Sequence, residues 1–336
     1  MDSRSSGDVI VVGGGVIGLA TAVVLAERGL RVRVWTREPA ERTTSAVAGG
    51  LWWPYHIEPM ASARAWALRS LEIYERLAAR PAETGVRLVD GVMGGTDLAD
   101  VESWAVGRLA GLRRSTAREY AAGAGIRARL PLIDMARHLP WLRERLLRAG
   151  GTVEERTVTD LAQVEAPVVV NCTGLGAREL AADASVRPVR GQLVVVENPG
   201  VDTWLVATGP DGEMAYLFPQ PGRLLLGGTA QDDVWSLEPD PKTAEAIVRR
   251  CAALRPEVAG ARILEHRVGL RPARAAVRLE RTPLPDGRTV VHHYGHGGAG
   301  VTVAWGCAEA AAELVRPAAD QDLSGRSSRR KAAVPR

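Results

Sequence analysis

The chain has 336 residues, 46% of them hydrophobic, and a formal net charge of +4. This length can bury a sizeable core and predicts two domains, because domains commonly run to about 100–200 residues. The charges are nearly balanced and the arginines are scattered among acidic residues, which excludes a nucleic-acid patch and a membrane-surface helix. Neither a signal peptide nor a membrane-spanning segment is expected, because glycines interrupt the apolar stretch that begins at Val9.

The cysteines indicate a reducing compartment. Cys172, Cys251 and Cys307 lack both metal-ligand spacing and CxxC spacing, and each has apolar or small neighbours. We therefore expect reduced thiols in the core of a cytoplasmic protein that binds no metal.

A glycine-rich turn is the first informative pattern along the chain. An apolar run at 9–12 predicts a buried strand, the sequence GGGVIG follows at 13–18, and a helix pattern begins at Leu19. The glycines permit the tight turn, let the backbone approach phosphates, and let the helix pack on the strand. Because N–H groups at the helix start then face an anion, the turn predicts a site for a dinucleotide's diphosphate. The expected contacts are Gly13, Gly15, Val16, Ile17 and Gly18.

A second strand completes a βαβ unit. Gly29 ends the first helix, and residues 31–35 alternate as a strand. In such units an acid after the second strand bonds the adenosine ribose. Glu38 is the nearest candidate, but Arg37 beside it would instead favour a 2′-phosphate, so both are expected cofactor contacts.

The middle of the chain changes architecture. Helices are predicted at 61–77 and 133–149, and an apolar strand at 166–170 runs into the polar turn 171–174. From Arg187 the pattern becomes alternating strands with hairpin turns, which predicts an antiparallel sheet. Its strands are expected at 192–196, 204–207, 215–218 and 224–227.

The end of the chain returns to the first architecture, with a strand at 289–292 and a helix at 301–315. Four turns rich in glycine and small polar residues now stand out, at 13–18, 43–55, 171–174 and 294–300. Small residues and free N–H groups let a flat ring system lie close to the backbone, as a flavin requires. Together the turns predict one large planar cofactor.

At this point the sequence resembles the D-amino-acid oxidase family of flavoproteins, within the glutathione-reductase-type FAD folds, over nearly all of residues 8–316. The motifs that carry the resemblance are VVGGGVIGLA, TTSAVAGGLWWPY, VVNCTGLGA, RPVRGQ, YLFP, VGLRPAR with AVRLER after it, and YGHGGAGVTVAWGCA. The resemblance implies an α/β fold, with a Rossmann-like FAD-binding domain built on a parallel sheet and an inserted α+β substrate domain with a mainly antiparallel sheet.

The expected domain boundaries follow from the change of pattern. The FAD-binding domain is assigned residues 1–56, 142–185 and 286–316, and the substrate domain is assigned 57–141 and 186–285. Residues 317–336 lose the apolar pattern and are expected to be a disordered tail.

The resemblance also implies roles for single residues. Arg274, the second arginine of RPAR, would grip the substrate α-carboxylate, which suits a planar guanidinium that makes two parallel hydrogen bonds. The Tyr216 hydroxyl would contact the same carboxylate, and the Gly298 carbonyl would accept a hydrogen bond from the amine. Arg271 and Arg278 are expected to be structural ion-pair partners.

The pocket and the cofactor contacts complete the expected site. Trp52 and Tyr55 would wall the pocket with His56 on its rim, whereas Trp53 would pack in the core and His296 would brace a loop. The remaining expected FAD contacts are Thr43, Thr44, Ser45, Gly49, Gly50, Leu51, Thr173, Gly174, Arg274, Gly297, Gly298, Gly300, Val301 and Thr302.

Two departures from the family pattern concern access to the site. The hairpin at 209–215 is short where some members carry a longer lid, and Ala299 stands where a bulky aromatic residue can stand. Both predict a more open entrance, from which product leaves without a gating lid movement.

The activity implied is oxidation of a D-amino acid by FAD and molecular oxygen. It gives a 2-oxo acid, ammonia and hydrogen peroxide, with no catalytic histidine. Neutral, mostly apolar side chains are favoured, because His56 is the only nearby candidate cation for an acidic one. A D-aspartate or D-glutamate oxidase, a glycine or sarcosine oxidase, and a dehydrogenase stay open as alternatives, as does a homodimer.

Overall fold

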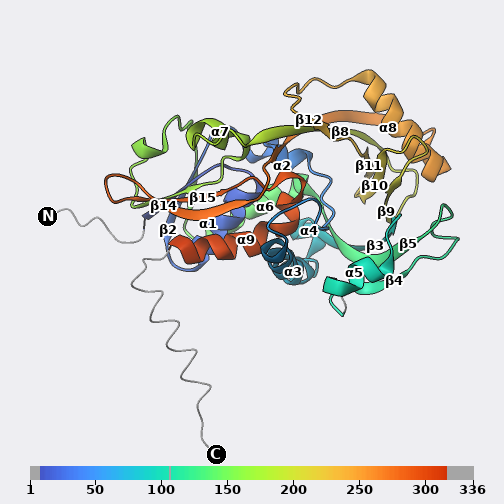
Figure 1. The fold of residues 1–336 in the computed structure, drawn as a ribbon, viewed down its shortest axis with the longest axis horizontal. Helices are drawn as coiled ribbons and strands as arrows, with labels where there is room; N and C mark the ends of the chain where they lie inside the picture. Colours follow the sequence, from blue (N-terminus) through green and yellow to red (C-terminus); the bar gives the residue numbers. More distant parts are fainter. Residues whose placement is uncertain (1–7, 106, 316–336) are drawn as a thin grey trace, which may run out of the picture.

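The computed structural model describes residues 8–105 and 107–315 of the chain, so the tail predicted at 317–336 lies outside the described residues. Two sheets organise the fold, one at each end of the elongated molecule in Figure 1. Among the described residues, none of the helices combines the length and apolar character needed to cross a bilayer.

The first sheet has the order β14-β15-β7-β1-β2-β6. Its strands run parallel except β14, which pairs antiparallel with β15 at the edge. The central strand β1 is buried and apolar, as expected of a strand covered on both faces. The bounds are β1 Asp8–Val12, β2 Arg31–Thr36, β6 Thr152–Glu155, β7 Val168–Asn171, β14 Arg278–Pro283 and β15 Thr289–Tyr294.

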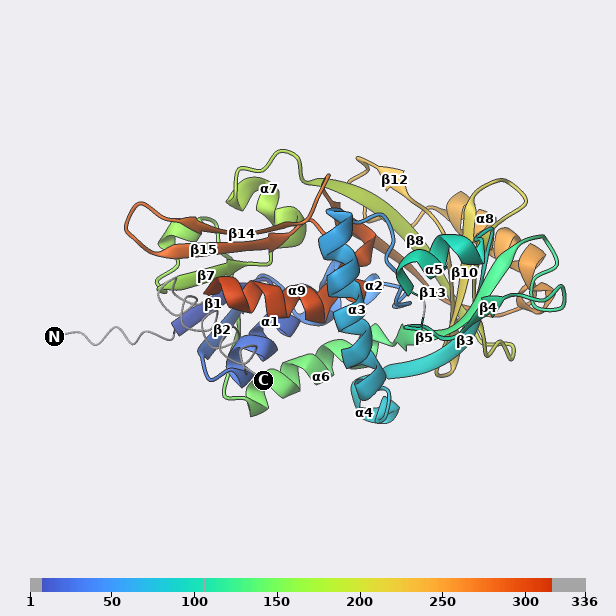
Figure 2. The ribbon, with the colours of Figure 1, turned by 60° about the horizontal axis from the view of Figure 1, so that its bottom comes forward.

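Helices α1 Val16–Glu27 and α9 Gly300–Val315 lie side by side against this sheet, and α6 Met135–Arg148 packs beside α1. Helix α3 Met60–Leu77 crosses α9 (Figure 2). The helices predicted at 61–77, 133–149 and 301–315 are therefore confirmed, with small shifts at their ends. The Asp134 side chain accepts a hydrogen bond from the Ala136 N–H and so fixes the start of α6.

The second sheet has the order β12-β8-β11-β10-β9-β3-β5-β4, and β13 also pairs with β8. Its pairs are antiparallel apart from β3 with β9. The bounds are β3 Val86–Gly94, β4 Ala110–Arg114, β5 Gly125–Ile133, β8 Arg187–Glu197, β9 Trp204–Thr208, β10 Met214–Gln220, β11 Arg223–Gly227, β12 Gln231–Asp232 and β13 Ile263–Ala273. The predicted antiparallel sheet is confirmed, but β3, β4 and β5 were not anticipated by the sequence pattern.

Two helices cover parts of the second sheet. Helix α8 Pro241–Leu254 packs against β8, β10 and β11, and α5 Leu98–Ala105 lies near β3 and β5 (Figures 1 and 2). The short helices are α2 Thr44–Val47, α4 Pro81–Thr84 and α7 Ala177–Leu180.

Two of the expected domain boundaries do not coincide with the ends of elements. The boundary at 142 falls inside α6, which is one continuous helix from Met135 to Arg148. The boundary at 286 comes too late, because β14 already pairs with β15 in the first sheet. The division into two domains itself stays a prediction.

Candidate active site

The glycine turn after β1 has the geometry of an anion cradle. Gly13 has φ +118°, and a Cβ there would lie 2.3 Å from the carbonyl oxygen of Cys172. A Cβ at Gly18 would lie 1.9 Å from the carbonyl oxygen of Gly13. Since both obstacles are backbone atoms, side chains cannot be accommodated at these positions.

The start of α1 leaves backbone donors available. Gly15 is the N-cap residue and provides no side-chain acceptor, while the Val16 N–H donates to Ser45 Oγ at 3.0 Å. The first-turn N–H groups of a helix have no partner within the helix. This glycine cradle at a helix N-terminus fits the diphosphate of FAD.

A second helix start approaches the same place. A Cβ at Gly300, the first residue of α9, would lie 4.0 Å from Ile17 Cγ1 in α1. Ser45 belongs to the short helix α2. In the same helix, Thr44 Oγ1 donates to the Leu270 carbonyl in β13 at 3.1 Å. The turns at 13–18, 43–47 and 297–300 are thus brought together, as the sequence predicted.

Several expected FAD contacts also have structural partners. A Cβ at Gly50 would lie 2.0 Å from the Ile133 carbonyl oxygen, and Leu51 forms a bridge with Leu132, so this segment is fastened to β5. Thr302 Oγ1 donates to the Trp53 carbonyl at 2.9 Å, and Thr173 Oγ1 donates to Asn171 Oδ1 at 2.7 Å.

Three other expected FAD contacts interact with residues of their own segment. Thr43 Oγ1 donates to the Ala40 carbonyl at 2.6 Å. Arg37 is exposed and lies 3.6 Å from the Glu38 carboxylate, so the two residues expected at the ribose pair with each other. The roles of Gly49, Gly174, Gly297 and Val301 as FAD contacts stay predictions.

Arg271, rather than Arg274, faces the expected substrate position. A Cβ at Gly298 would lie 3.6 Å from Arg271 Cδ and 3.4 Å from Tyr55 Cδ1, so these side chains meet over the glycine loop. Arg271 Nη1 donates to the Thr229 carbonyl at 2.8 Å. Among the side chains that the structure describes, no carboxylate forms an ion pair with Arg271, so its expected role as an ion-pair partner is wrong.

Tyr216 lies with Arg271 in the same place. The positive charge of the Arg271 guanidinium acts on the Tyr216 phenol, so the two side chains are neighbours. Burial raises the pKa of the Tyr216 phenol to about 12, against a smaller opposing effect of Arg271, so the hydroxyl stays protonated at neutral pH. The ring stacks on Phe218 with centroids 4.4 Å apart. A protonated phenol beside an unpaired guanidinium is suited to a carboxylate ligand.

Two glycines make room for these side chains. A Cβ at Gly191 would lie 2.4 Å from Arg271 Nη2, and a Cβ at Gly227 would lie 2.3 Å from Tyr216 Cζ. Both glycines lie on strands that neighbour the functional residue, β8 beside β13 and β11 beside β10. Which glycine makes room for which side chain depends on the pairing of the strands, so the sequence alone carried no signal that favours Arg271.

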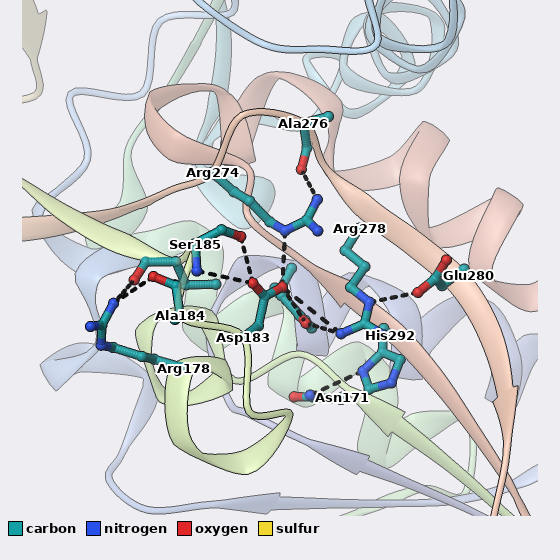
Figure 3. A network of polar contacts seen from close by, with 12 residues as sticks. Asn171, Arg178, Asp183, Ala184, Ser185, Arg274, Ala276, Arg278, Glu280 and His292 are labelled. Atoms are coloured by element: carbon teal, nitrogen blue, oxygen red, sulfur yellow. Dashed lines mark hydrogen bonds and ion pairs between the residues drawn. The ribbon is translucent and has the colours of Figure 1, made fainter.

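Arg274 instead belongs to a polar network behind the site (Figure 3). Its Nε donates to Asp183 Oδ2 at 2.9 Å and its Nη1 donates to the Ala276 carbonyl at 2.8 Å. The Tyr294 hydroxyl donates to the same Asp183 oxygen at 2.9 Å, and Arg278 donates to Tyr294 at 2.7 Å. The prediction of Arg274 as the carboxylate ligand is therefore corrected, because its guanidinium is already neutralised by Asp183. Arg278 is a structural ion-pair partner, as predicted.

Of the two aromatic residues expected to wall the pocket, one lies in the core and the other lies near Gly298. Trp52 is fully buried and its indole N–H donates to the Ala67 carbonyl at 3.1 Å, which places it in the core rather than on a pocket wall. Tyr55 is 38% exposed and packs edge-on against His56 at 4.1 Å, near Gly298. Trp53 packs against Trp104 at 5.8 Å, as predicted.

A family model and several relatives match nearly the whole chain. The family described as FAD dependent oxidoreductase matches residues 8–314. A protein of Streptomyces coelicolor named D-amino-acid oxidase is 73% identical over 94% of this chain and 98% of its own length. A Rubrobacter xylanophilus protein of the same name is 49% identical, over 94% of this chain and 97% of its own. Human D-aspartate oxidase is 36% identical, over 91% of this chain and 94% of its own.

Solved structures share the fold at lower identity. Glycine oxidase from Geobacillus kaustophilus superposes with a TM-score of 0.77 at 23% identity, covering 93% of this chain and 95% of that one. The fold, the FAD cradle and these relatives agree: the chain belongs to the D-amino-acid oxidase family of FAD-dependent oxidoreductases.

Proposed function

We propose that this protein is a D-amino-acid oxidase, which converts a D-amino acid and oxygen into a 2-oxo acid, ammonia and hydrogen peroxide. The observation that carries the proposal is the position of Arg271, which pairs with no carboxylate among the described side chains and lies beside Tyr216 and Gly298. The names of the relatives from Streptomyces coelicolor and Rubrobacter xylanophilus support the same reaction.

The residues act by positioning the substrate. Arg271 binds the α-carboxylate through two parallel hydrogen bonds, and the protonated Tyr216 hydroxyl donates a third. The Gly298 carbonyl accepts a hydrogen bond from the neutral amine and so fixes which face of the α-carbon is presented. The turns at 13–18, 43–51, 173–174 and 297–302 would hold FAD, which would supply the acceptor for the hydride of the α-carbon and the route of its electrons to oxygen.

This chemistry needs no side chain that takes a proton. The substrate amine is bound neutral, and its lone pair assists the departure of the α-hydrogen. Burial lowers the pKa of His296 to about 3, which makes this residue a poor base at neutral pH. His56 is exposed beside Tyr55 and lies on the rim.

The preferred side chain is neutral and mostly apolar in this proposal. An acidic substrate would require a second cation beside Arg271, and His56 is the candidate closest to Tyr55. D-aspartate is the main alternative substrate, because human D-aspartate oxidase is also a relative. A dehydrogenase would differ in its electron acceptor and would produce no peroxide in air.

One experiment decides between these activities. The purified yellow protein is made anaerobic and mixed in turn with D-alanine, D-methionine, D-aspartate, glycine, sarcosine and the matching L-amino acids, and flavin absorbance is followed. We expect fast bleaching with neutral D-amino acids and peroxide formation when air is admitted. Bleaching only by L-amino acids, glycine or sarcosine would refute the proposal. Faster bleaching by D-aspartate than by neutral D-amino acids would show that D-aspartate is the preferred substrate.

The compartment and the oligomeric state are also proposals. Cys172, Cys251 and Cys307 are buried and unpaired, which supports a reducing cytoplasm. Trp235 and Leu237 are exposed in the segment before α8 and support a homodimer. Fractionation of the native cells tests the first proposal and light scattering tests the second.

A further inference from the structure

Two histidines and one cysteine, side chains that can ligate soft or borderline metal ions, lie close together beside the glycine loop 297–300. His293 is the last residue but one of β15, His296 lies in the following loop, and Cys307 lies in α9, with exposed fractions of 0%, 4% and 0%. Each offers a ligand atom, and the three atoms lie within 4.8 Å of one another. The spacing in the sequence gives no hint of this, because α9 must fold back beside β15 to bring the thiol to the imidazoles.

The hydrogen bonds of His293 determine its protonation state. Thr21 Oγ1 donates its single proton to the Ile17 carbonyl at 2.7 Å. His293 Nδ1 lies 3.2 Å from the same oxygen and 3.9 Å from Cys172 Sγ, so with the Thr21 proton already used this nitrogen is assigned as the donor. The lone pair is therefore on Nε2. A ligating histidine commonly holds its other nitrogen in this way.

Both imidazoles have an unused nitrogen. Nε2 of His293 and Nε2 of His296 are buried and have no hydrogen-bond partner among the described residues. The rings meet edge to face with centroids 5.0 Å apart. Nine buried side-chain N and O atoms of the described residues have no hydrogen-bond partner, and these two are distinguished by lying beside a buried thiol that can also ligate. Because an unpartnered buried polar atom is costly, this pair beside Cys307 points to an occupant that satisfies both.

We propose that His293, His296 and Cys307 form a site for a thiophilic d¹⁰ cation, Cu⁺ or Zn²⁺. Two imidazoles and a thiolate suit these soft or borderline ions. The three ligands include no oxygen atom, as Mg²⁺ or Ca²⁺ would require. Binding forms two metal–nitrogen bonds and one metal–sulfur bond, and the Cys307 thiol releases one proton to solvent without any change of oxidation state.

A cation bound at this site would have a structural role. Its ligands lie on both sides of the loop 297–300, and His293 is joined to α1 through Thr21. A bound cation would therefore fix the loop, the start of α9 and α1 relative to one another. The proposal does not depend on which amino acid the enzyme oxidises.

Metal content of the FAD-loaded enzyme is the direct test. Because the ligands are buried, the cation has to enter during folding, so the protein is produced in medium supplemented with zinc or copper. A second batch is refolded under reducing conditions with FAD and Zn²⁺ or Cu⁺. After extensive washing with chelator, elemental analysis should find about one Cu⁺ or Zn²⁺ per chain in at least one arm.

Variants identify the ligands. Cys307→Ser and His293→Asn should lose the retained metal, whereas Cys251→Ser, at a buried cysteine in α8, should keep it. Flavin absorbance and circular dichroism check that each variant is folded. Should the ligand variants fail to fold, X-ray absorption of the wild-type protein must show one sulfur at about 2.3 Å and nitrogens at about 2.0 Å.

Three results would overturn the proposal. The first is substoichiometric metal in both the zinc and the copper arms. The second is full retention of metal by folded Cys307→Ser. The third is a high-resolution structure of the metal-supplemented protein with an ordered water between the two Nε2 atoms.

Discussion

At the scale of single residues, Arg271 and Arg274 lie only three positions apart in the sequence but have different surroundings. Arg274 bonds to Asp183 and has its charge neutralised within the fold. Arg271 donates to the Thr229 carbonyl and lies beside Tyr216, and its charge remains available. An unneutralised guanidinium at a recessed position is what an anionic substrate requires.

Replacing these two arginines should therefore have effects of very different size on catalysis. We expect Arg271→Ala to lower kcat/KM for a neutral D-amino acid by roughly 10²–10³-fold, because charged hydrogen bonds to the substrate are lost. Arg271→Lys should fall in between, since lysine cannot form two parallel bonds. Steady-state peroxide assays give the values. The matched control Arg274→Ala should change kcat/KM only a few-fold. The reverse ranking would show that Arg274, and not Arg271, binds the substrate carboxylate.

Asp183 should make stability depend on pH. Burial acts to raise the pKa of its carboxyl, but hydrogen bonds from Ser185, Tyr294 and Arg274 outweigh it and lower the pKa to about 2. A carboxyl whose pKa is lower in the folded state stabilises the fold above its unfolded pKa. The contribution of about 2 kcal/mol at neutral pH should be lost as the pH falls from about 4 to about 2.

The measurement is urea unfolding of wild type and Asp183→Asn across this pH range. The difference in unfolding free energy should be constant between about pH 5 and pH 7 and should shrink below about pH 4. A difference that stays the same down to about pH 2 would show that the carboxylate charge is unimportant.

At the scale of elements, the β1–α1 turn shows why particular glycines are required. The Cβ of an alanine at 18 would meet the backbone oxygen of Gly13, which no change of rotamer can relieve. The turn must then open, and the N–H groups at the start of α1 move away from the diphosphate.

Gly18→Ala should accordingly yield protein that has lost most of its bound flavin. The ratio of absorbance at 450 nm to that at 280 nm measures this directly. Gly260→Ala is the matched control, because a Cβ there meets no atom within 4 Å and its φ is ordinary. It should keep the flavin, with stability changed by less than about 0.5 kcal/mol. Normal flavin content in Gly18→Ala would remove the turn from the cofactor site.

The hairpin between β9 and β10 is a second informative element. Its turn closes through a hydrogen bond from the Gly209 N–H to the Glu213 carbonyl at 2.7 Å, and Asp211 pairs with Arg250 at 2.9 Å. Arg250 also donates to the Met214 and Gly228 carbonyls, at 2.8 Å and 3.1 Å. A turn held at this many points is poorly suited to act as a moving lid.

Product release should therefore not limit turnover. We expect kcat to match the rate of flavin reduction measured by stopped flow, and to be insensitive to added viscogen, because no lid has to open. A turnover rate equal to a separately measured, slower rate of product release would contradict the short-lid interpretation.

At the scale of the whole molecule, one apolar cluster joins the two sheets. It includes Leu19 of α1, Leu130 of β5, Trp204 of β9 and Val301 of α9. A shared core of this kind opposes independent motion of the two parts. A separate cluster fills the space between α8 and the second sheet.

The shared core predicts cooperative unfolding of the holoenzyme. Urea denaturation followed by flavin release and by tryptophan fluorescence should give coincident transitions, because Trp52 and Trp204 are buried in the same cluster. Separate midpoints, with flavin lost while the tryptophans remain buried, would show that the two sheets unfold independently.

The sequence by itself determined the βαβ start, the FAD cradle, the change from parallel to antiparallel sheet and the family. These follow from local patterns: glycine spacing, periodicity and contiguous motifs. Only the tertiary structure decided between Arg271 and Arg274, moved Trp52 into the core and united His293, His296 and Cys307. The reason is physical: whether a charge is neutralised, or a side chain buried, depends on residues far away in the chain, such as Asp183, Ala67 and Thr229.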